Sequence, residues 1–184
     1  MPKFMVNASG DQIFLPDNSH QYFSQIPGEK YVRYVENDKH DCRDSDANAS
    51  LVAFYHSVVH NLPRPKFSFA LEKDGPIRVT VEDTPTEVNL WQATNPKARD
   101  FRLMTIGKAY AKTPLKPEAD KKTYIARVDK PATGFTAFYV ELVYNNPGPA
   151  PFKFTTEVNV IPDILPFKWE DAFKKPNPAI DEDE

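Results

Sequence analysis

An acid and a base follow two neighbouring apolar runs near the start of the chain. Asp11 comes after the run Phe4-Met5-Val6, and His40 comes after the run from Tyr31 to Val35. If these runs are adjacent strands of an open parallel sheet, the residues beyond their carboxyl ends face one crevice. The Asp11 carboxylate would then orient the His40 imidazole, which would take a proton from a hydroxyl. Asp before His is also the order of acid and base in a Ser…Asp…His triad.

Three other residues have side chains that could do chemistry. Cys42 could be a replacement nucleophile, but a base seldom reaches a neighbour two positions away in a loop, so we expect an inert thiol. His56 and His60 are four apart on a predicted helix, a spacing that can bind a metal on one face. No Cys, Asp or Glu is placed to complete such a site, and we therefore expect no metal.

Aromatic residues of the second half could line a carbohydrate or peptide groove. They are Trp91, Phe101, Phe135, Phe138 and Tyr139. Aromatic residues at strand spacing are more often part of a core, which we expect for Phe101 and Phe135, while the role of Trp91 stays open. The mixed-charge stretch 116–122 is interpreted as a solvated loop.

The first 63 residues alternate between strand and helix patterns. Residues 3–8 and 30–35 are short apolar runs typical of buried strands. A helix is predicted between Pro16 and Pro27-Gly28, because proline favours a first turn and Pro-Gly ends one. A second helix, capped by one of residues 44–46 and ended at Pro63, carries an apolar stripe formed by Leu51, Phe54, Tyr55, Val58 and Leu62. This alternation predicts α/β organisation with a parallel sheet over residues 1–63.

After Pro65 the spacing of apolar residues changes from helical to alternating. Period-two runs recur at 67–71, 77–81, 88–92, 101–105, 124–128, 135–144 and 152–161, and Asp74-Gly75 is a hairpin signal. These strands predict an immunoglobulin-like β-sandwich over residues 64–162, without an antibody-like disulfide because there is one cysteine. Residues 163–184, rich in proline and ending Asp-Glu-Asp-Glu, are expected to form an irregular acidic tail.

Composition limits the class of protein. The 184 residues are 40% hydrophobic and 12% aromatic, which is enough for a core. The net charge of -3 gives no reason to expect nucleic acid or an anionic membrane as a partner. No apolar run is long enough to cross a bilayer, and the first residues show no signal peptide.

Stretches from both halves share their sequence with one family. They are 7–17, 27–35, 37–40, 88–96, 98–102 and 152–158. In these stretches, which extend in order over nearly the whole chain up to Phe167, the sequence resembles the carboxy-terminal part of the PhoPQ-activated pathogenicity-related proteins. The autocrine proliferation repressors of slime moulds resemble the same family.

The resemblance implies a secreted or periplasmic, serine-hydrolase-like protein. It implies an α/β fold followed by an all-β part, as the C-terminal fragment of an α/β-hydrolase fold plus the immunoglobulin-like sandwich. Asp11 and His40 would lie where the triad acid and base of the family lie. No Gly-x-Ser-x-Gly occurs in this chain, so we expect it to lack the nucleophile and to be inactive alone.

Two hypotheses about function and partners remain. In the first, the pair acts on a protein, peptide or ester, without a cofactor, once a nucleophile is supplied. The alternative is a non-enzymatic secreted binding or signalling module that acts through the β-sandwich. A parallel sheet of 63 residues is small for a domain that must cover both sheet faces, so we also expect unpaired strand edges and self-association.

Overall fold

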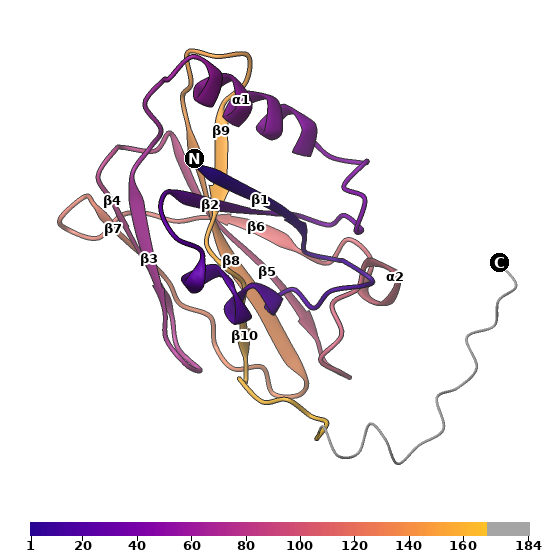
Figure 1. The fold of residues 1–184 in the computed structure, drawn as a ribbon. Helices are drawn as coiled ribbons and strands as arrows, with labels where there is room; N and C mark the ends of the chain where they lie inside the picture. The colour runs from indigo at the N-terminus through magenta and orange to yellow at the C-terminus, as the bar shows by residue number, and fades with distance from the viewer. Residues whose placement is uncertain (169–184) are drawn as a thin grey trace, which may run out of the picture.

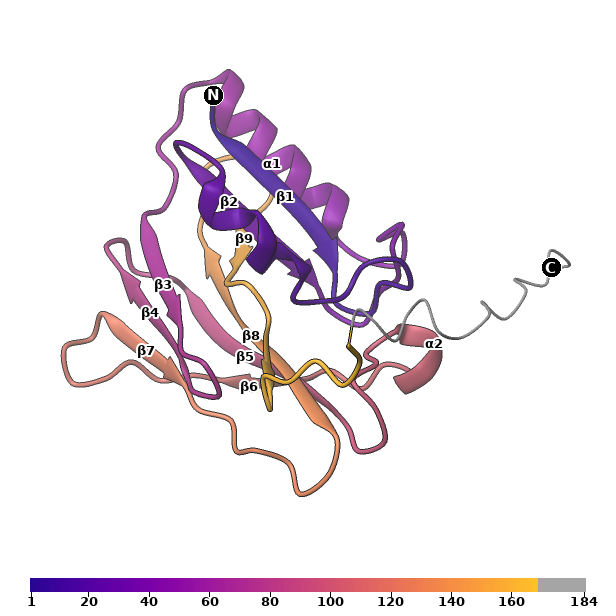
Figure 2. The same ribbon diagram turned by 60° about the horizontal axis from the view of Figure 1, so that its bottom comes forward.

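The computed structural model describes residues 1–168 and shows two β-sheets with one helix of several turns (Figures 1 and 2). The large sheet has the order β1-β2-β9-β8-β5-β6, and β10 also pairs with β8. Its strands are β1 (Lys3–Ala8), β2 (Lys30–Val35), β5 (Glu87–Asn95), β6 (Ala111–Pro114), β8 (Phe135–Tyr144), β9 (Phe152–Thr155) and β10 (Asn159–Ile161). The small sheet has the order β3-β4-β7, formed by β3 (Phe67–Leu71), β4 (Ile77–Val81) and β7 (Thr123–Ala126).

The first two strands form a parallel pair. They run in register from Lys3 opposite Lys30 to Ala8 opposite Val35, which confirms the strands predicted over 3–8 and 30–35. Aromatic and β-branched residues dominate β2, and all but its first residue are buried. Because the strands are parallel and in register, their carboxyl ends lie together at one edge of the sheet.

The small sheet confirms the alternation expected of a half-buried strand. On β4, Ile77, Val79 and Val81 are buried, whereas Arg78 and Thr80 are exposed. The inward residues belong to a core cluster with Phe138, Val140 and Leu142 of β8, so this core lies between the two sheets. The hairpin predicted at Asp74-Gly75 joins β3 to β4.

The other face of the large sheet carries a second core cluster. Its members include Val32 and Tyr34 of β2 together with Tyr139 of β8. Phe23 and Phe101, which lie outside the strands, cover this face. The large sheet is therefore buried on both sides, which explains the nearly continuous burial along β8.

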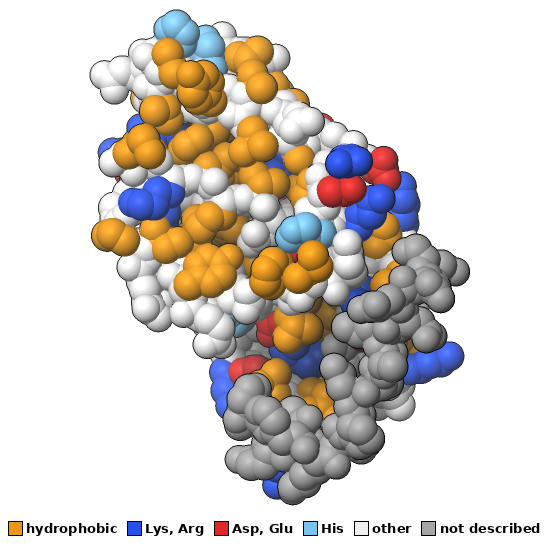
Figure 3. Space-filling view, turned by 45° about the vertical axis from the view of Figure 1, so that its right-hand side comes forward, with side chains coloured by type: hydrophobic (Ala, Val, Ile, Leu, Met, Phe, Trp, Pro, Cys, Tyr) orange, Lys and Arg blue, Asp and Glu red, His pale blue; other side chains and the backbone are white. Residues whose placement is uncertain are grey.

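The helix α1 (Ala47–Val59) packs on the large sheet through small residues. Its buried positions are Ala47, Ser50, Ala53, Phe54 and Ser57. Of the predicted apolar stripe, Phe54 is buried and Val58 packs partly buried against the core, but the prediction is wrong for Leu51 and Tyr55. Small side chains let the helix approach the strands closely, and Phe54 is the one large side chain of α1 that is buried. Leu51, Val52, Tyr55 and Val59 are exposed. Figure 3 shows hydrophobic side chains gathered on one face of the molecule.

An ion pair between a buried guanidinium and a half-exposed carboxylate joins the start of α1 to β2. The guanidinium of Arg33, which is fully buried, contacts the carboxylate of Asp46 and the hydroxyl of Ser50. Lys153 of β9 donates to the other oxygen of Asp46 at 2.6 Å. Burial opposes ionisation of Asp46, but the hydrogen bonds from Lys153 and Arg33 prevail and lower the pKa of its carboxyl.

The prediction of an α/β fold followed by an all-β part is wrong. Strand β2 has a parallel neighbour on one side only, and on the other side Val32 pairs antiparallel with Thr155 of β9. Among residues 1–168, α1 is the only helix longer than four residues, so helices do not cover both faces of a parallel sheet. The described chain is mainly β, without the pattern of an α/β-hydrolase.

Two local predictions also differ from the structure. The helix predicted between Pro16 and Pro27 is two short 3₁₀ helices, η1 (Asn18–Gln21) and η2 (Phe23–Gln25). The strand predicted over 101–105 is instead the single-turn helix α2 (Leu103–Ile106). Phe101 is buried as expected, but its neighbours form hydrogen bonds of a helical turn.

The predicted boundary at residue 63 stays a prediction, and so does the β-sandwich over 64–162. The large sheet contains strands from both sides of this boundary. Most of the acidic tail predicted over 163–184 lies outside the described residues. In residues 1–168, no helix has the length and apolar composition needed to cross a membrane.

Candidate functional site

The acid and the base singled out in the sequence are in contact. Asp11 follows β1 and His40 follows β2, at the edge where these parallel strands end together. Nδ1 of His40 lies 2.8 Å from Oδ2 of Asp11. The side chain of Asp11 is 8% exposed, and that of His40 is 45% exposed. A nearly buried carboxylate therefore faces one ring nitrogen of a histidine that is open to solvent.

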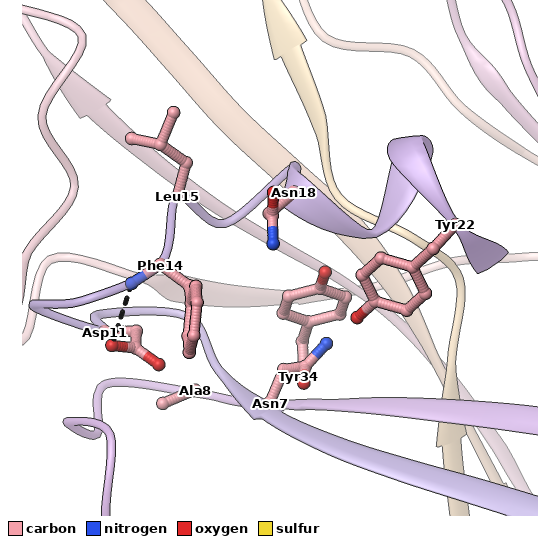
Figure 4. Close-up of a pocket in the computed structure, with 8 residues that line it drawn as sticks. All are labelled: Asn7, Ala8, Asp11, Phe14, Leu15, Asn18, Tyr22 and Tyr34. Atoms are coloured by element: carbon pink, nitrogen blue, oxygen red, sulfur yellow. Dashed lines mark hydrogen bonds between the residues drawn. The ribbon is translucent and has the colours of Figure 1, made fainter.

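Two backbone groups fix the orientation of the Asp11 carboxylate. Its Oδ1 accepts hydrogen bonds from the N–H groups of Ile13 at 2.7 Å and Phe14 at 3.2 Å. Figure 4 shows this turn at the side of a pocket. Because Oδ1 is occupied by these donors, Oδ2 is the oxygen that faces His40.

His40 is held by its backbone and by a ring contact. Its N–H donates to Oε1 of Gln12 at 3.1 Å, and its imidazole lies 5.7 Å from the ring of Phe14 between centroids. With Nδ1 directed at Asp11, the second ring nitrogen, Nε2, is left for another partner. Within residues 1–168, no side chain forms a hydrogen bond with Nε2.

A close approach at Gly10 brings the two loops together. The N–H of Gly10 donates to the carbonyl of Asp38 at 3.1 Å, and the hydroxyl of Ser9 accepts from the N–H of Asn37 at 3.1 Å. A Cβ at Gly10 would lie 2.8 Å from the Asp38 carbonyl oxygen and 3.0 Å from the Leu103 side chain. Glycine is therefore required where the loop of Asp11 meets the loop of His40.

The segment between β5 and β6 supports both loops. The N–H of Leu103 donates to the carbonyl of Gly10 at 2.9 Å. The side-chain amide of Asn37 forms two hydrogen bonds of 2.9 Å with the backbone of Tyr110, one as donor and one as acceptor. Asn37 adopts a φ of 52°, which asparagine tolerates better than most residues. This contact spans 73 residues of sequence.

A buried ion pair connects the same segment to the residues after Asp11. Arg99 donates to both carboxylate oxygens of Asp17, at 2.5 and 3.3 Å, and its side chain is 4% exposed. Two parallel hydrogen bonds of this kind fix geometry as well as charge. The turn from Asp11 to Asp17 is thus attached at its start through Gly10 and at its end through Arg99.

A pocket of about 250 Å³ lies beside Asp11 (Figure 4). Its lining residues are Asn7, Ala8, Asp11, Phe14, Leu15, Asn18, Tyr22 and Tyr34. Apart from Asp11, the lining carries no carboxylate, ammonium or guanidinium. In Figure 4 the amide of Asn18 and the rings of Phe14 and Tyr22 lie around Tyr34. Aromatic rings, side-chain amides and tyrosine hydroxyls therefore form most of the wall beside Asp11.

Cys42 lies close to the pair but has the properties of an unreactive thiol. Its Sγ is 3.8 Å from the carbonyl oxygen of His40, which the thiol faces as a weak donor. Burial, together with the charges of Asp38 and Asp11, raises the pKa of the Cys42 thiol to about 11. At neutral pH the thiol is protonated, so it is not the nucleophile that would work with His40.

The two histidines predicted on the helix lie in contact at the end of α1, with their rings tilted by 44°. The rings of His56 and His60 are 4.4 Å apart between centroids. Nδ1 of His56 is buried without a hydrogen-bond partner among the residues that the structure describes. In that same part of the chain, no group of three or more His, Cys, Asp or Glu side chains is arranged to hold a metal.

The aromatic candidates of the second half are mostly buried. Phe101, Phe138 and Tyr139 belong to the two cores, and Phe135 packs partly buried against the second one. Trp91 is half-buried on β5 with the ammonium of Lys112 6.0 Å from its ring. These side chains therefore contribute to packing, and the stretch 116–122 is an exposed loop.

Sequence reasoning did not identify the residues that position the pair. Gln12, Phe14 and Asn37 contact His40 or its loop, yet none belongs to a motif. A polar loop with asparagine is a signal for a turn with positive φ. This signal does not reveal the contact between Asn37 and Tyr110, because that contact depends on how the distant segments pack.

Comparison with known proteins relates this chain to one family. The family model of the PhoPQ-activated pathogenicity-related protein matches residues 1–102, a region that contains both Asp11 and His40. Autocrine proliferation repressor protein A of Dictyostelium discoideum is 30% identical over 193 residues, which cover 91% of this chain and 39% of that protein. This chain therefore spans well under half the length of that relative. The match over more than half of its residues shows that the chain belongs to the PhoPQ-activated pathogenicity-related protein family.

Proposed function

We propose that Asp11 and His40 are the acid and the base of a serine-type catalytic triad for acyl or peptidyl transfer. The proposal is supported by one observation above all, the 2.8 Å contact between Nδ1 of His40 and the nearly buried carboxylate of Asp11. This is the arrangement in which a carboxylate fixes the tautomer of a catalytic histidine. The proposed triad has its hydroxyl outside residues 1–168.

The proposed roles follow from the hydrogen bonds. Donation from Nδ1–H to Asp11 leaves a lone pair on Nε2, which takes the proton of the attacking hydroxyl. The imidazolium formed in that step is stabilised by the Asp11 charge, whose Oδ2 lies 2.8 Å from Nδ1. Because the backbone of Ile13 and Phe14 already holds Oδ1, the carboxylate does not have to reorient during the reaction.

A fluorophosphonate probe, which labels activated serine nucleophiles, tests this proposal. The present chain is expected to remain unlabelled, because no described hydroxyl contacts His40. Autocrine proliferation repressor protein A is expected to be labelled, and replacement of its aligned histidine should reduce the labelling rate by at least about a thousandfold. Labelling of the present chain, or unchanged labelling of the histidine variant, would contradict the proposal.

A second candidate function is a secreted or periplasmic binding or signalling module. The name of the relative, a repressor of proliferation, favours this candidate. A cell-proliferation assay with the purified chain separates the two candidates. If the chain acts as a signal without catalysis, wild type and His40→Ala are expected to reduce growth equally. An effect that disappears in His40→Ala would favour the catalytic role instead.

A further inference from the structure

A second cavity, of about 390 Å³, lies between β2 and β3 and shares no lining residue with the pocket at Asp11. Aromatic side chains from three segments form its walls. They are Phe23 of η2, Tyr31 of β2, and Phe67 and Phe69 of β3. The rings of Phe23 and Phe69 are stacked, with 5.9 Å between centroids and 24° between planes. We call this cavity the β3 groove.

A carboxylate without a partner lines the β3 groove. Glu157 is 7% exposed, and its Oε1 is buried without a hydrogen-bond partner among residues 1–168. None of the ion pairs in that part of the chain includes Glu157. A buried polar oxygen that forms no hydrogen bond is costly, so native proteins rarely keep one without a reason. A cationic ligand would supply the missing partner.

The nearby cation of the protein itself does not fill this role. Nζ of Lys30 lies 5.0 Å from the ring centroid of Phe23 and donates to the carbonyls of Ser24 and Ile26, at 3.0 and 2.9 Å. Its charge is thus held by backbone oxygens at the side of the groove rather than by Glu157. The contact also shows that an ammonium fits against the aromatic wall.

The open edge of β3 provides backbone groups for a peptide. The N–H of Glu82 donates to the carbonyl of Lys66, and the N–H of Glu72 donates to the carbonyl of Pro76. These pairs lie directly before and after β3, so within β3 the even-numbered residues are the ones that bond to β4. In an antiparallel ladder the intervening residues direct their N–H and C=O groups away from the partner. Phe67 and Phe69 therefore direct these groups towards the free edge, where a further strand could pair.

We propose that the β3 groove binds an extended peptide as an added strand, with a lysine or arginine side chain of that peptide paired to Glu157 between the aromatic rings. Backbone hydrogen bonds to β3 would supply affinity, and the buried carboxylate would select a basic residue. This site goes beyond the proposed triad and does not depend on it. The nucleophile and the pair at Asp11 take no part in it.

Calorimetric titration with two blocked peptides tests the proposal. The probes are Ac-Thr-Val-Thr-Lys-Thr-Val-Thr-NH₂ and the same peptide with norleucine in place of lysine. The lysine peptide is expected to bind at least about tenfold more tightly, as a charge-assisted hydrogen bond predicts. In Glu157→Gln the two peptides should bind equally. Equal binding to wild type, or an unchanged preference in Glu157→Gln, would overturn the proposal.

Two matched variants control for indirect effects. Glu82→Gln removes an exposed carboxylate from the small sheet and should leave the preference for lysine unchanged. Lys30→Met removes the competing cation beside Phe23 and should tighten binding of the lysine peptide by about threefold. Thermal unfolding followed by circular dichroism shows whether each variant is folded. Weaker binding in Lys30→Met would contradict the assigned position of the ligand cation.

A separate experiment tests whether the peptide pairs with β3 through its backbone. Methylation of alternate peptide nitrogens removes the donors that would face β3, and it should weaken binding by at least about tenfold. The opposite set of methylations leaves those donors in place and is the control. Binding of n-butylammonium alone as tightly as the lysine peptide would contradict strand addition.

Discussion

At the scale of single residues, the candidate site depends on one carboxylate with three hydrogen bonds. Asp11 accepts from two backbone N–H groups and faces Nδ1 of His40, so both of its oxygens are used. His40 in turn has no other side chain bonded to its ring among residues 1–168. The tautomer of His40 is therefore controlled by Asp11, which can be tested without a substrate.

Asp11→Asn is expected to change the tautomer of His40. In wild type, Nδ1 carries the proton and Nε2 is unprotonated when the ring is neutral. The amide of asparagine can present an N–H to Nδ1, which favours the tautomer protonated at Nε2. Long-range ¹H–¹⁵N NMR spectra distinguish the two forms by their nitrogen shifts. An unchanged pattern in Asp11→Asn would show that the contact does not select the tautomer.

Gly10 is the second residue on which the site depends. A methyl group there would be 2.8 Å from a backbone oxygen of Asp38, which cannot move without moving the loop of His40. Gly10→Ala is therefore expected to lower the free energy of unfolding by about 1–3 kcal/mol, the cost of overpacking, and to shift the His40 resonances. Urea unfolding and NMR measure the two effects.

Gly28→Ala is a suitable control for Gly10→Ala. Gly28 has a φ of 78° but no heavy atom within 4 Å of the added Cβ. The variant is expected to lose about 1 kcal/mol from backbone strain alone, without a change in the His40 resonances. If both variants shifted His40 equally, close packing at Gly10 would not be the cause.

At the scale of elements, the single turn α2 is held by the carboxylate of Asp100, which lies just before it. Asp100 accepts from the backbone and guanidinium of Arg102 and from the hydroxyl of Thr105. The Arg102 guanidinium, with these other donors, lowers the pKa of Asp100 to about 2 against the opposing effect of burial. The helix in turn supports Gly10 through the N–H of Leu103.

The stability supplied by Asp100 is expected to depend on pH. A folded-state pKa of about 2, below the ordinary value of 3.8, stabilises the folded protein above pH 3.8. Because the Arg102 side chain is half exposed, solvent screens the pair, and this contribution is about 1 kcal/mol or less. It is lost as the pH falls towards 2. Urea unfolding at pH 7, 4 and 2 should show Asp100→Asn less stable than wild type at pH 7 and nearly equal at pH 2. A constant difference would contradict this assignment.

Local sequence patterns predicted the strands better than the helices. The strands at β1, β2 and β4 follow from apolar runs and alternation, which depend on neighbours along the chain. Only part of the buried face of α1 was predictable: Phe54 is buried as expected, but close contact with the sheet selects Ala53 and Ser57 over Leu51. Likewise Phe101 is buried, but the alternation after it does not belong to a strand.

At the scale of the whole molecule, the fold class could not be read from the sequence because it depends on one long-range pairing. The N–H of Tyr34 donates to the side chain of Thr155, 121 residues later, and Val32 pairs with the same residue. Parallel β1 and β2 indicate α/β organisation when considered alone. Their junction with antiparallel β9 gives a mainly β fold instead. The position of Asp11 and His40 was predictable because it needs only the parallel pair.

The outer edge of β1 is expected to cause self-association. The N–H of Lys3 donates to the carbonyl of Glu29 directly before β2, and that of Ser9 donates to Val35 at the end of β2. The N–H groups of Phe4 and Val6 therefore face away from the sheet. Val6→Pro removes one outward donor without removing a bond to β2. Sedimentation should show concentration-dependent oligomers for wild type and fewer for the variant. A wild type that stays monomeric at high concentration would contradict this expectation.

Met5→Pro is the matched control for Val6→Pro. The N–H of Met5 points towards β2, so its loss removes a ladder hydrogen bond and is expected to destabilise the protein by about 3 kcal/mol or more. Val6→Pro should cost far less. Equal destabilisation of the two variants in urea unfolding would show that β1 pairs on both sides in solution.

The attachments of the Asp11 and His40 loops to residues 99–110 have a thermodynamic consequence. Leu103, Arg99 and Tyr110 each bond to one of these loops, so a displacement of their segment changes the distance between acid and base. A molecule that prefers one position of the segment therefore also favours one separation of Asp11 and His40. By linkage, a second ligand that favours the same separation at the pair raises the affinity for that molecule by the same factor.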